Sequence, residues 1–370
     1  MAKFLSFENP LFRIDWLALA VTLLLLGTGL TFIASAGYGN ETIPLLQRQW
    51  FRQLLFILIS IPVYCGATLF DYRWLKDAIG IVYAGCFLLL AGVLIFGKTI
   101  NNSTSWYDLK IVDFQPSEVV KIGLVITLAA YLGDPLRNTR HPRIVLLPLV
   151  LTGILFLLIL KQPDLGTAMI LPCVVLTLLF VAGLSWRMLG LLLLLGVMSL
   201  PLAWGLAKDY QKDRILVFLN PDRDPLNASW NMKQSKMAVG SGGLRGKGIG
   251  QGTQNLLGFL PNTVAPTDFI FSVIAEEKGF FGSAGLLGLY SLLFGCLART
   301  AVRACDMFGR LIAVGILTML SVHVTINVAM TIGLMPIVGL PLPLVSYGGS
   351  FVVSMMLALG LVQSVHIRRS

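Results

Sequence analysis

The sequence has 370 residues, of which 56% are hydrophobic and 12% are charged, and its formal net charge at pH 7 is +10. Soluble domains carry about a quarter charged residues, so this composition excludes a soluble globular protein and indicates an integral membrane protein. The Lys and Arg residues are spread over loops, which argues against a nucleic-acid partner and favours membrane topology and anionic membrane lipids as the reason for the charge.

Ten apolar runs are long enough to cross a bilayer, which needs about 20 residues with a range of about 17 to 25. They lie near residues 16–36, 51–70, 78–97, 117–132, 144–160, 167–183, 188–206, 269–298, 311–333 and 344–366. The first run is too long for the apolar part of a signal peptide, and nine more follow it. The sequence therefore predicts a single all-α domain over residues 1–370, a polytopic membrane protein with ten transmembrane helices.

The distribution of positive charge predicts the orientation of these helices. Cytoplasmic loops are enriched in Lys and Arg. With a cytoplasmic N-terminus, the inner segments carry Lys3, Arg13, Arg73, Lys76, Arg137, Arg140, Arg143, Arg187, Arg299, Arg303, Arg310, Arg368 and Arg369, whereas the short outer loops carry only Arg48, Arg52, Lys98, Lys110 and Lys161. Both termini are therefore expected in the cytoplasm, and the long loop at about 207–267 is expected outside the cytoplasmic membrane.

The fourth predicted helix carries an ionisable pair near its outer end. Glu118 and Lys121 are three residues apart and share one face of the helix. An ionisable pair inside a membrane span is a functional hypothesis by default, and the alternative is an ion pair that only fixes helix packing. Trp106 in the second outer loop and the segment Gln162-Pro163-Asp164 in the third lie on the same side of the membrane.

Glycines are concentrated at residues 240–252, within the long outer loop, together with Arg245 and Lys247. Free backbone N–H groups and two cations predict a site that holds a pyrophosphate. The segment matches no Walker or dinucleotide pattern, so a merely flexible loop is the alternative.

Asp268 lies at the beginning of the eighth apolar run. This run of about 30 residues would be about 45 Å long as a helix, which exceeds a hydrocarbon core of about 30 Å. Residues 279–298 alone would span the membrane, so residues 268–278, including Glu276 and Glu277, are expected at the outer interface. Asp268 is the candidate catalytic carboxylate, and the alternative is that Thr267 or Asp268 only caps the helix.

A last outer element, SYGGS at residues 346–350, enters the tenth helix after a proline-rich segment and makes Ser346 a candidate ligand-binding residue. His323 and Asn327 in the ninth helix are expected to be hydrogen-bond partners between helices and not ligands. No CxxC pair or local His cluster is present, so no metal-binding residue is predicted. If the protein uses a divalent cation such as Mg²⁺ or Mn²⁺, carboxylates would bind it.

Motifs along the whole chain resemble those of the SEDS family (shape, elongation, division and sporulation), and they are closer to its elongation branch than to its division branch. These motifs are FQPSE at 114–118, QPDLGT at 162–167, GSGGL at 240–244, GKG at 246–248, TDFIF at 267–271, and a signature from Asn327 to SYGGS at 346–350. The chain departs from the family pattern at Asn262 to Pro266, at Lys278 and at Phe351.

The resemblance implies a ten-helix peptidoglycan glycosyltransferase that polymerises lipid II outside the cytoplasmic membrane for cell-wall elongation and rod shape. It implies a class B penicillin-binding protein and other elongation proteins as partners. Asp268 matches the family's essential carboxylate, Glu118 and Lys121 its cavity ion pair, and Trp106 a functional loop aromatic. With lipid II and a lipid-linked glycan strand as substrates, Asp268 would act as general base, and Lys121, Arg245, Lys247 or a divalent cation would offset the charge of the leaving pyrophosphate.

Two other functions fit a bundle with buried charges. A flippase or transporter would place its binding groups near the bilayer midplane and would show repeats, whereas the charges here gather at the outer face and no repeat is visible. A catalytically silent scaffold of a wall-building complex differs from an enzyme, at the level of sequence, only in the retained carboxylate.

Overall fold

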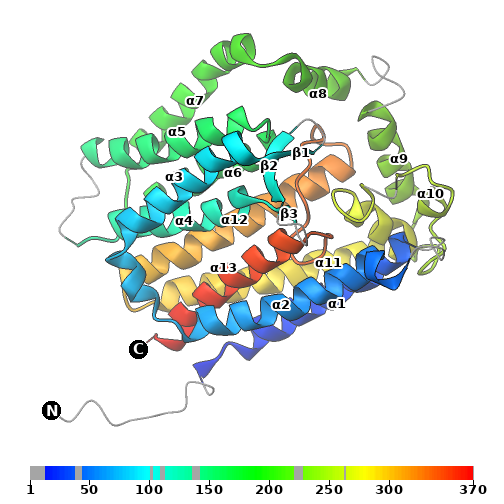
Figure 1. Ribbon diagram of the computed structural model, residues 1–370, viewed down its shortest axis with the longest axis horizontal. Coiled ribbons are helices and arrows are strands. Elements are labelled where there is room, and N and C mark those ends of the chain that lie inside the picture. Colours follow the sequence, from blue (N-terminus) through cyan, green and yellow to red (C-terminus); the bar gives the residue numbers. More distant parts are fainter. Residues whose placement is uncertain are drawn as a thin grey trace.

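Long apolar helices make up most of the fold (Figure 1). The computed structural model describes residues 13–37, 44–100, 103–108, 113–135, 142–220, 228–261 and 264–369. Each predicted span coincides with a helix. These helices are α1 (Trp16–Ala36), α2 (Gln49–Leu69), α3 (Ile79–Phe96), α4 (Pro116–Leu132), α5 (Leu146–Lys161), α6 (Leu165–Val181), α7 (Trp186–Leu206), α11 (Ile270–Arg303), α12 (Met307–Thr331) and α13 (Gly349–Ile367).

In the described ranges, six of these helices are both long and apolar enough to cross a membrane, namely α1, α2, α3, α11, α12 and α13. Helices α5 and α6 and the Trp186–Leu202 part of α7 are apolar but shorter. The structure thus confirms a helical protein with several membrane-spanning helices, and the count of ten crossings stays a prediction.

Short elements connect the long helices. They are η2 (Leu45–Gln47), η3 (Tyr72–Lys76), η4 (Pro142–Val145), α8 (Asp209–Leu219), α9 (Ala228–Ser241) and α10 (Thr253–Leu256). The last three lie in the long loop predicted at about 207–267, whose described part therefore contains helices that the sequence did not predict. The tenth helix begins at Gly349 and not near residue 344, because residues 342–346 form a tight turn in which the N–H groups of Val345 and Ser346 bond to the carbonyl of Leu342.

A small antiparallel sheet adds to the helical architecture that the sequence predicts. Strands β1 (Lys98–Ile100), β2 (Ser103–Asp108) and β3 (Asp113–Phe114) pair in the order β1-β2-β3. Lys98 joins the outer strands, since its Nζ lies 3.3 Å from Asp108 Oδ2 and 3.5 Å from Asp113 Oδ1. Sequence periodicity gave no signal for strands this short.

Helix α4 occupies the centre of the bundle. It packs against α3, α6, α12 and α13, and almost all its side chains are buried, including those of Glu118 and Lys121. By contrast α7 extends away from the bundle (Figure 1) and contacts mainly α6. The leucines at 193, 194 and 195 are more than half exposed, as expected for a helix that faces lipid acyl chains.

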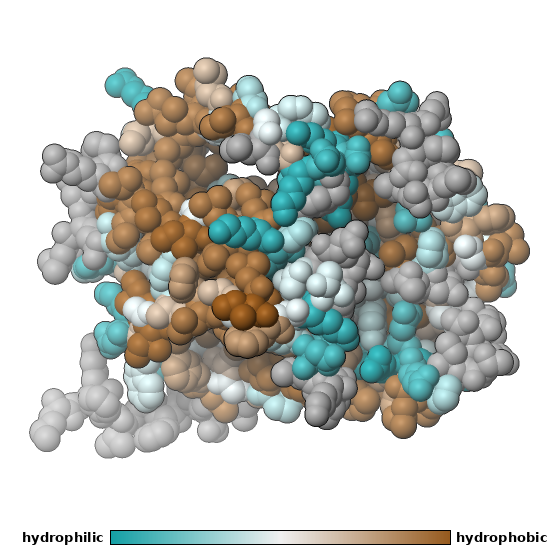
Figure 2. Space-filling view, turned by 45° about the horizontal axis from the view of Figure 1, so that its top comes forward, coloured by the Kyte–Doolittle hydropathy of each residue, from teal (hydrophilic) through white to brown (hydrophobic). Residues whose placement is uncertain are grey.

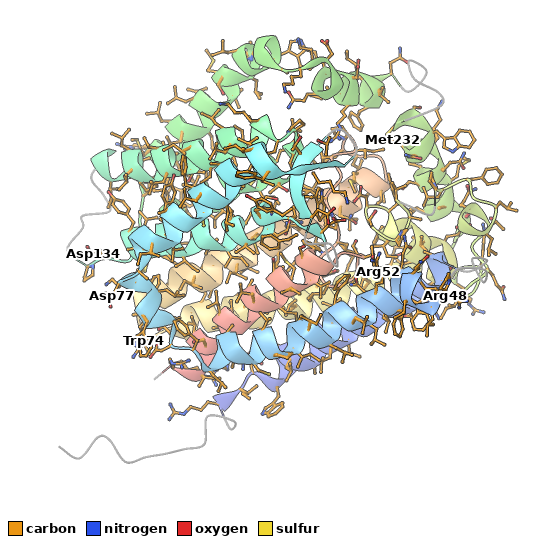
Figure 3. The ribbon with its side chains drawn as sticks, in the orientation of Figure 1. Arg48, Arg52, Trp74, Asp77, Asp134 and Met232 are labelled. Atoms are coloured by element: carbon orange, nitrogen blue, oxygen red, sulfur yellow. The ribbon has the colours of Figure 1, made fainter. Side chains whose placement is uncertain are left out.

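The two ends of the bundle differ in character. The beginning of α1 and the end of α13 lie at one end, where Asp15 binds Arg299 at the end of α11 at 2.6 Å. Trp74, Asp77 and Asp134 mark this end in Figure 3, and Arg48, Arg52 and Met232 mark the other. Figure 2 shows apolar side chains over much of the flank and hydrophilic side chains toward the end that carries the sheet and the long loop.

Candidate active site

Helix α11 is broken at Gly279, the residue where the sequence places the start of the eighth membrane span. Gly279 has φ 65° and ψ −160°, which no helix contains. Two helix N–H groups and two helix carbonyls lose their partners there, and the backbone of the glycine-rich segment replaces them. The four hydrogen bonds are Phe280 N to Gly243 O (2.8 Å), Phe281 N to Leu244 O (3.2 Å), Lys247 N to Glu276 O (3.0 Å) and Gly248 N to Glu277 O (3.0 Å).

Glycine is required in this segment because its backbone lies against that of α11. A Cβ at Gly242 would lie 2.0 Å from the carbonyl oxygen of Ala275, and a Cβ at Gly246 would lie 2.2 Å from that of Glu277. The N–H groups of residues 246, 247, 248, 250 and 251 all have protein acceptors. The prediction of a pyrophosphate site made of free N–H groups is therefore wrong for these residues, because the break in α11 uses them.

The paired glutamates hold the same segment with their side chains. Glu276 Oε1 accepts from Lys247 Nζ at 2.7 Å, from Thr253 Oγ1 at 3.1 Å and from the backbone N–H of Gln254 at 3.1 Å. Glu277 Oε1 accepts from the hydroxyl of Ser35 in α1. Both glutamates are buried. Lys247 is thus neutralised within the protein, whereas Arg245 is exposed.

Asp268 lies directly before α11 with its backbone fixed and its carboxylate uncommitted. Phe269 occupies the N-cap position without a side-chain cap, so the alternative that Thr267 or Asp268 caps the helix is wrong. The backbone N–H of Asp268 donates to Val264 O at 3.0 Å, and Asn327 Nδ2 donates to Asp268 O at 2.9 Å. No residue in the described ranges donates a hydrogen bond to the Asp268 carboxylate.

The turn before α13 binds the two residues that precede Asp268 in the chain. Ser346 Oγ donates to Thr267 O and accepts from the backbone N–H of Leu342 at 2.8 Å. The N–H of Tyr347 donates to Pro266 O at 2.8 Å. Ser346 is fully buried, so its hydroxyl positions the backbone beside the candidate carboxylate. Pro266, which departs from the family pattern, thus accepts a hydrogen bond from this turn.

Burial raises the pKa of the Asp268 carboxyl from 3.8 to about 6. The positive charge of Arg214 in α8 opposes this rise in pKa, and the negative charge of Asp164 adds to it. The side chain is enclosed by many protein atoms yet keeps some contact with solvent. Asp268 is therefore largely ionised at neutral pH, with a pKa close enough to 7 for proton transfer.

Residues 338–341, which follow α12, lie beside Asp268 and connect it to both sides of the site. Arg214 Nη1 donates to Val338 O at 3.3 Å. A Cβ at Gly339, where φ is +73°, would lie 3.5 Å from Asp268 Oδ2. Asn327 Nδ2 also donates to Leu340 O, at 2.7 Å. We call residues 338–341 the site wall.

The predicted pair of Glu118 and Lys121 is formed at the beginning of α4. Lys121 Nζ lies 2.9 Å from both carboxylate oxygens of Glu118. A third contact joins Lys121 Nζ to His323 Nε2 in α12, at 2.7 Å. All three side chains are buried. The expectation that His323 is a hydrogen-bond partner between helices is confirmed. The same expectation for Asn327 is wrong, because its side chain binds backbone carbonyls of two loops, those of Asp268 and Leu340.

The motif residues near Trp106 surround the beginning of α4. Trp106 is partly exposed on β2, where it pairs with Lys98. Gln115 Nε2 donates to Asp164 Oδ2 at 3.0 Å, and Ser350 Oγ donates to Asp113 O at 2.8 Å. The sheet, the turn before α6 and the beginning of α13 therefore meet at the end of the bundle that carries Asp268.

Two residues of the site were not singled out by sequence reasoning. Arg214 lies in the long loop, whose charges carry no topological information, so nothing marked it in the sequence. Gln53 in α2 is buried and binds the turn before α13, through Nε2 to Ser346 O at 3.3 Å and through Oε1 from the N–H of Gly348 at 3.1 Å. A lone polar residue in an apolar helix was the available signal for Gln53.

In the part of the chain that the structure describes, no three His, Cys, Asp or Glu side chains are grouped so that they could hold a metal ion. Asp268 lies within electrostatic reach of Asp164 and Arg214. The arrangement offers one ionised carboxylate with a raised pKa, and a guanidinium close to it.

Comparisons with known proteins identify the family of this chain. The FtsW/RodA/SpoVE family, described as "Cell cycle protein", matches residues 15–370. Peptidoglycan glycosyltransferase MrdB of Escherichia coli (strain K12) is 43% identical over 294 residues, which cover 78% of this chain and 77% of that protein. Peptidoglycan glycosyltransferase RodA of Treponema pallidum (strain Nichols) is 34% identical over 433 residues, with 96% and 98% covered.

A solved structure described as "Structural coordination of polymerization and crosslinking by a peptidoglycan synthase complex" contains a chain with a TM-score of 0.80 and 33% identity, covering 95% of this chain and 97% of that chain. The likeness thus extends over the bundle and its loops. The chain belongs to the FtsW/RodA/SpoVE family of cell cycle proteins, the SEDS family that its motifs resemble.

Proposed function

We propose that this protein is a peptidoglycan glycosyltransferase that polymerises lipid II at the outer face of the cytoplasmic membrane, for cell-wall elongation and rod shape. The observation that carries the proposal is Asp268, a carboxylate with a pKa of about 6 whose backbone is fixed while its oxygens are uncommitted. The names of the relatives, which are peptidoglycan glycosyltransferases, support the reaction class.

In the proposed reaction the 4-hydroxyl of an incoming lipid II attacks the anomeric carbon of the lipid-linked glycan strand. Asp268 accepts the hydroxyl proton as the new carbon–oxygen bond forms. The bond between the anomeric carbon and the pyrophosphate breaks, and the lipid pyrophosphate leaves with the electron pair. Its negative charge requires a cation close to Asp268.

Arg214 is the best placed protein cation for this task, because its charge reaches Asp268 and its guanidinium binds the site wall. Arg245 is exposed and available to a phosphate, whereas Lys121 and Lys247 are each paired with a glutamate. A divalent cation bound to the pyrophosphate itself would supply further charge. We assign Trp106 to substrate contact at the sheet, and Ser346, Glu118 and Lys121 to support of the site.

A class B penicillin-binding protein is the proposed partner, since this chain resembles a component of a peptidoglycan synthase complex. Such a partner would cross-link the strands that this protein makes, together with other proteins of the elongation complex. Both termini are proposed to lie in the cytoplasm, which places Asp268 at the outer face where lipid II arrives.

The deciding experiment is a gel-based polymerisation assay with purified protein and purified lipid II. Glycan strands should form with the wild-type protein, with and without the partner, and the Asp268→Asn protein should form almost none. An EDTA arm tests the divalent cation. If the purified wild-type protein moves lipid II across vesicle membranes without polymerising it, the protein is a flippase. If it does neither but binds its partner, it is a scaffold.

A further inference from the structure

We propose that His323 is a positioning residue for glycosyl transfer, which holds the site wall beside Asp268 and couples the wall to the Glu118–Lys121 pair. This inference rests on the proposed function. It concerns a side chain that the catalytic scheme above does not use, in the middle of a helix whose other side chains are mainly apolar.

The contacts of His323 determine which ring nitrogen carries its proton. The ammonium group of Lys121 can only donate hydrogen bonds, so the contact of 2.7 Å requires His323 Nε2 to accept. The proton of the neutral imidazole is then on Nδ1, which lies 3.4 Å from Pro341 O and donates toward it. His323 is therefore an acceptor on the side of α4 and a donor on the side of the site wall.

His323 and Asn327 are four residues apart and lie on the same face of α12. Asn327 binds the carbonyl of Leu340, and His323 binds the carbonyl of the next residue, Pro341. Two neighbouring carbonyls of the site wall are thus fixed to one rigid helix. Of the other two residues of the wall, Val338 accepts a hydrogen bond from Arg214, and Gly339 lies beside the carboxylate of Asp268.

The groups that face His323 come from α4, from α13 and from Pro341 in the site wall. Glu118 and Lys121 lie on α4, and Phe351 lies at the beginning of α13 with its ring centroid 5.3 Å from that of His323. Lys121 Nζ lies 5.9 Å from the Phe351 ring. Phe351, one of the departures from the family pattern, therefore closes the space beside the ammonium, so that Lys121 faces Glu118, His323 and an aromatic ring.

These contacts indicate that Lys121 supports the site through Glu118 and His323 and does not bind the leaving pyrophosphate. Its Nζ is surrounded by the carboxylate of Glu118 and the imidazole of His323, and its side chain is 1% exposed. The pair fixes the tautomer of His323, and the Nδ1–H of His323 fixes the wall. Displacement of a reacting group by about 1 Å costs up to about 10²-fold in rate, so loss of this contact should lower the rate of chemistry.

The test compares His323→Phe, which keeps a ring of similar size but removes both hydrogen-bonding nitrogens, with His323→Gln, whose amide supplies one acceptor and one donor. Thr318→Val is the matched control, since among the described residues the Thr318 hydroxyl bonds only to Val314 O, within α12. Each full-length protein is purified, its folded fraction is measured, and the rate of lipid II polymerisation is recorded against lipid II concentration and against pH.

His323→Phe should lower kcat by about 10-fold or more with KM within about twofold, because positioning and not binding is impaired. A looser wall admits water to Asp268, so the acid limb of the pH–rate profile should move to lower pH. The kcat of His323→Gln should stay within about threefold of the wild-type value, and the kcat of Thr318→Val should equal the wild-type value. The position of the acid limb does not depend on how much protein folds, so it separates positioning from a loss of folded protein.

Wild-type kcat and an unmoved acid limb in His323→Phe would overturn the inference while the proposed function stands. Equal losses in His323→Gln and His323→Phe would also overturn it, since ring packing and not hydrogen bonding would then matter. If the wild-type protein itself fails to polymerise lipid II, the proposed function is what fails.

Discussion

Asn327 donates both hydrogens of its amide to backbone carbonyls, one to Asp268 O at 2.9 Å and one to Leu340 O at 2.7 Å. A single buried side chain in α12 therefore joins the residue that carries the candidate base to the wall that lies beside its carboxylate. The activity should depend on this amide through the two backbone carbonyls that it holds in place.

Replacing the amide tests this relationship. In Asn327→Leu the carbonyls of Leu340 and Asp268 lose their donor, which costs about 1–3 kcal/mol for the buried Leu340 carbonyl and less for the partly buried one of Asp268. We expect a lower melting temperature and polymerisation reduced by about 10-fold or more in the protein that remains folded. Thr331→Val is a buried control on the same helix, because in the part of the chain that the structure describes the Thr331 hydroxyl bonds only to Val328 O. Equal activity of the two variants would contradict the assignment.

Asp268→Asn separates catalysis from stability. Asn cannot accept the proton as a carboxylate does, so polymerisation should fall by at least about 10²-fold. The protein should fold and bind its partner normally, because the Asp268 side chain caps no helix. If the Asn variant polymerised lipid II at the wild-type rate, Glu276 or Glu277 would be the next carboxylates to test.

The same variant should be more stable than wild type at neutral pH. The folded-state pKa of Asp268 is raised from 3.8 to about 6, so its contribution to stability is fully present below about pH 4 and is lost as pH rises through 6. At pH 8 the buried charge destabilises the protein by at most about 3 kcal/mol, and by less because the side chain keeps some contact with solvent. Melting curves at pH 5 and pH 8 should show a larger gain for Asp268→Asn at pH 8.

The rate should depend on pH through the same group. A general base must be ionised, so kcat/KM should fall as pH falls through about 6, with the slope expected for one proton. An acid limb centred near pH 4 would indicate that water reaches Asp268 freely in the working enzyme. A rate that stays constant down to about pH 3, below the ordinary pKa of an Asp carboxyl, would exclude Asp268 as the base.

The Glu118–Lys121 pair should not tolerate the substitution of one partner alone. Removing one partner leaves a buried charge uncompensated, at a cost of about 3–5 kcal/mol. Glu118→Ala and Lys121→Ala should therefore each impair folding or activity more than the charge-reversed double variant. The reversed pair places a carboxylate beside His323 Nε2, so the imidazole must move its proton to Nε2, and full recovery is not expected. Normal activity of both single variants would reject the pairing.

Glycine at 246 should be indispensable for the break in α11. Gly246→Ala would place a Cβ 2.2 Å from the carbonyl oxygen of Glu277, with φ at +78°. Gly250→Ala is the matched control, since φ there is +72° but no atom of the other described residues lies within 4 Å of the position that the Cβ would take. The control should cost about 1–2 kcal/mol for the left-handed conformation, and Gly246→Ala clearly more, as measured by thermal unfolding in detergent. Equal melting temperatures would show that the segment adapts.

Composition and periodicity determined much of this protein, because the bilayer imposes a length and polarity on every helix that crosses it. The ten apolar runs coincide with helices, and the surplus length of the eighth run predicted that its membrane span starts at residue 279, the position where the structure shows a break in α11. Glu118 and Lys121 were paired correctly because their spacing of three residues fixes their distance within one helix.

Contacts between distant segments could not be predicted in this way, because nothing in local spacing records them. Only the tertiary structure shows that the N–H groups of Lys247 and Gly248 bond to carbonyls freed by the break in α11, so that these two groups are not available to a phosphate. Only the tertiary structure places Arg214 near Asp268 and His323 between Lys121 and Pro341, contacts that span up to 202 residues of sequence. The sequence alone thus determined the helices and the candidate carboxylate, whereas packing across the bundle decided which polar groups are committed to the fold and which remain for chemistry.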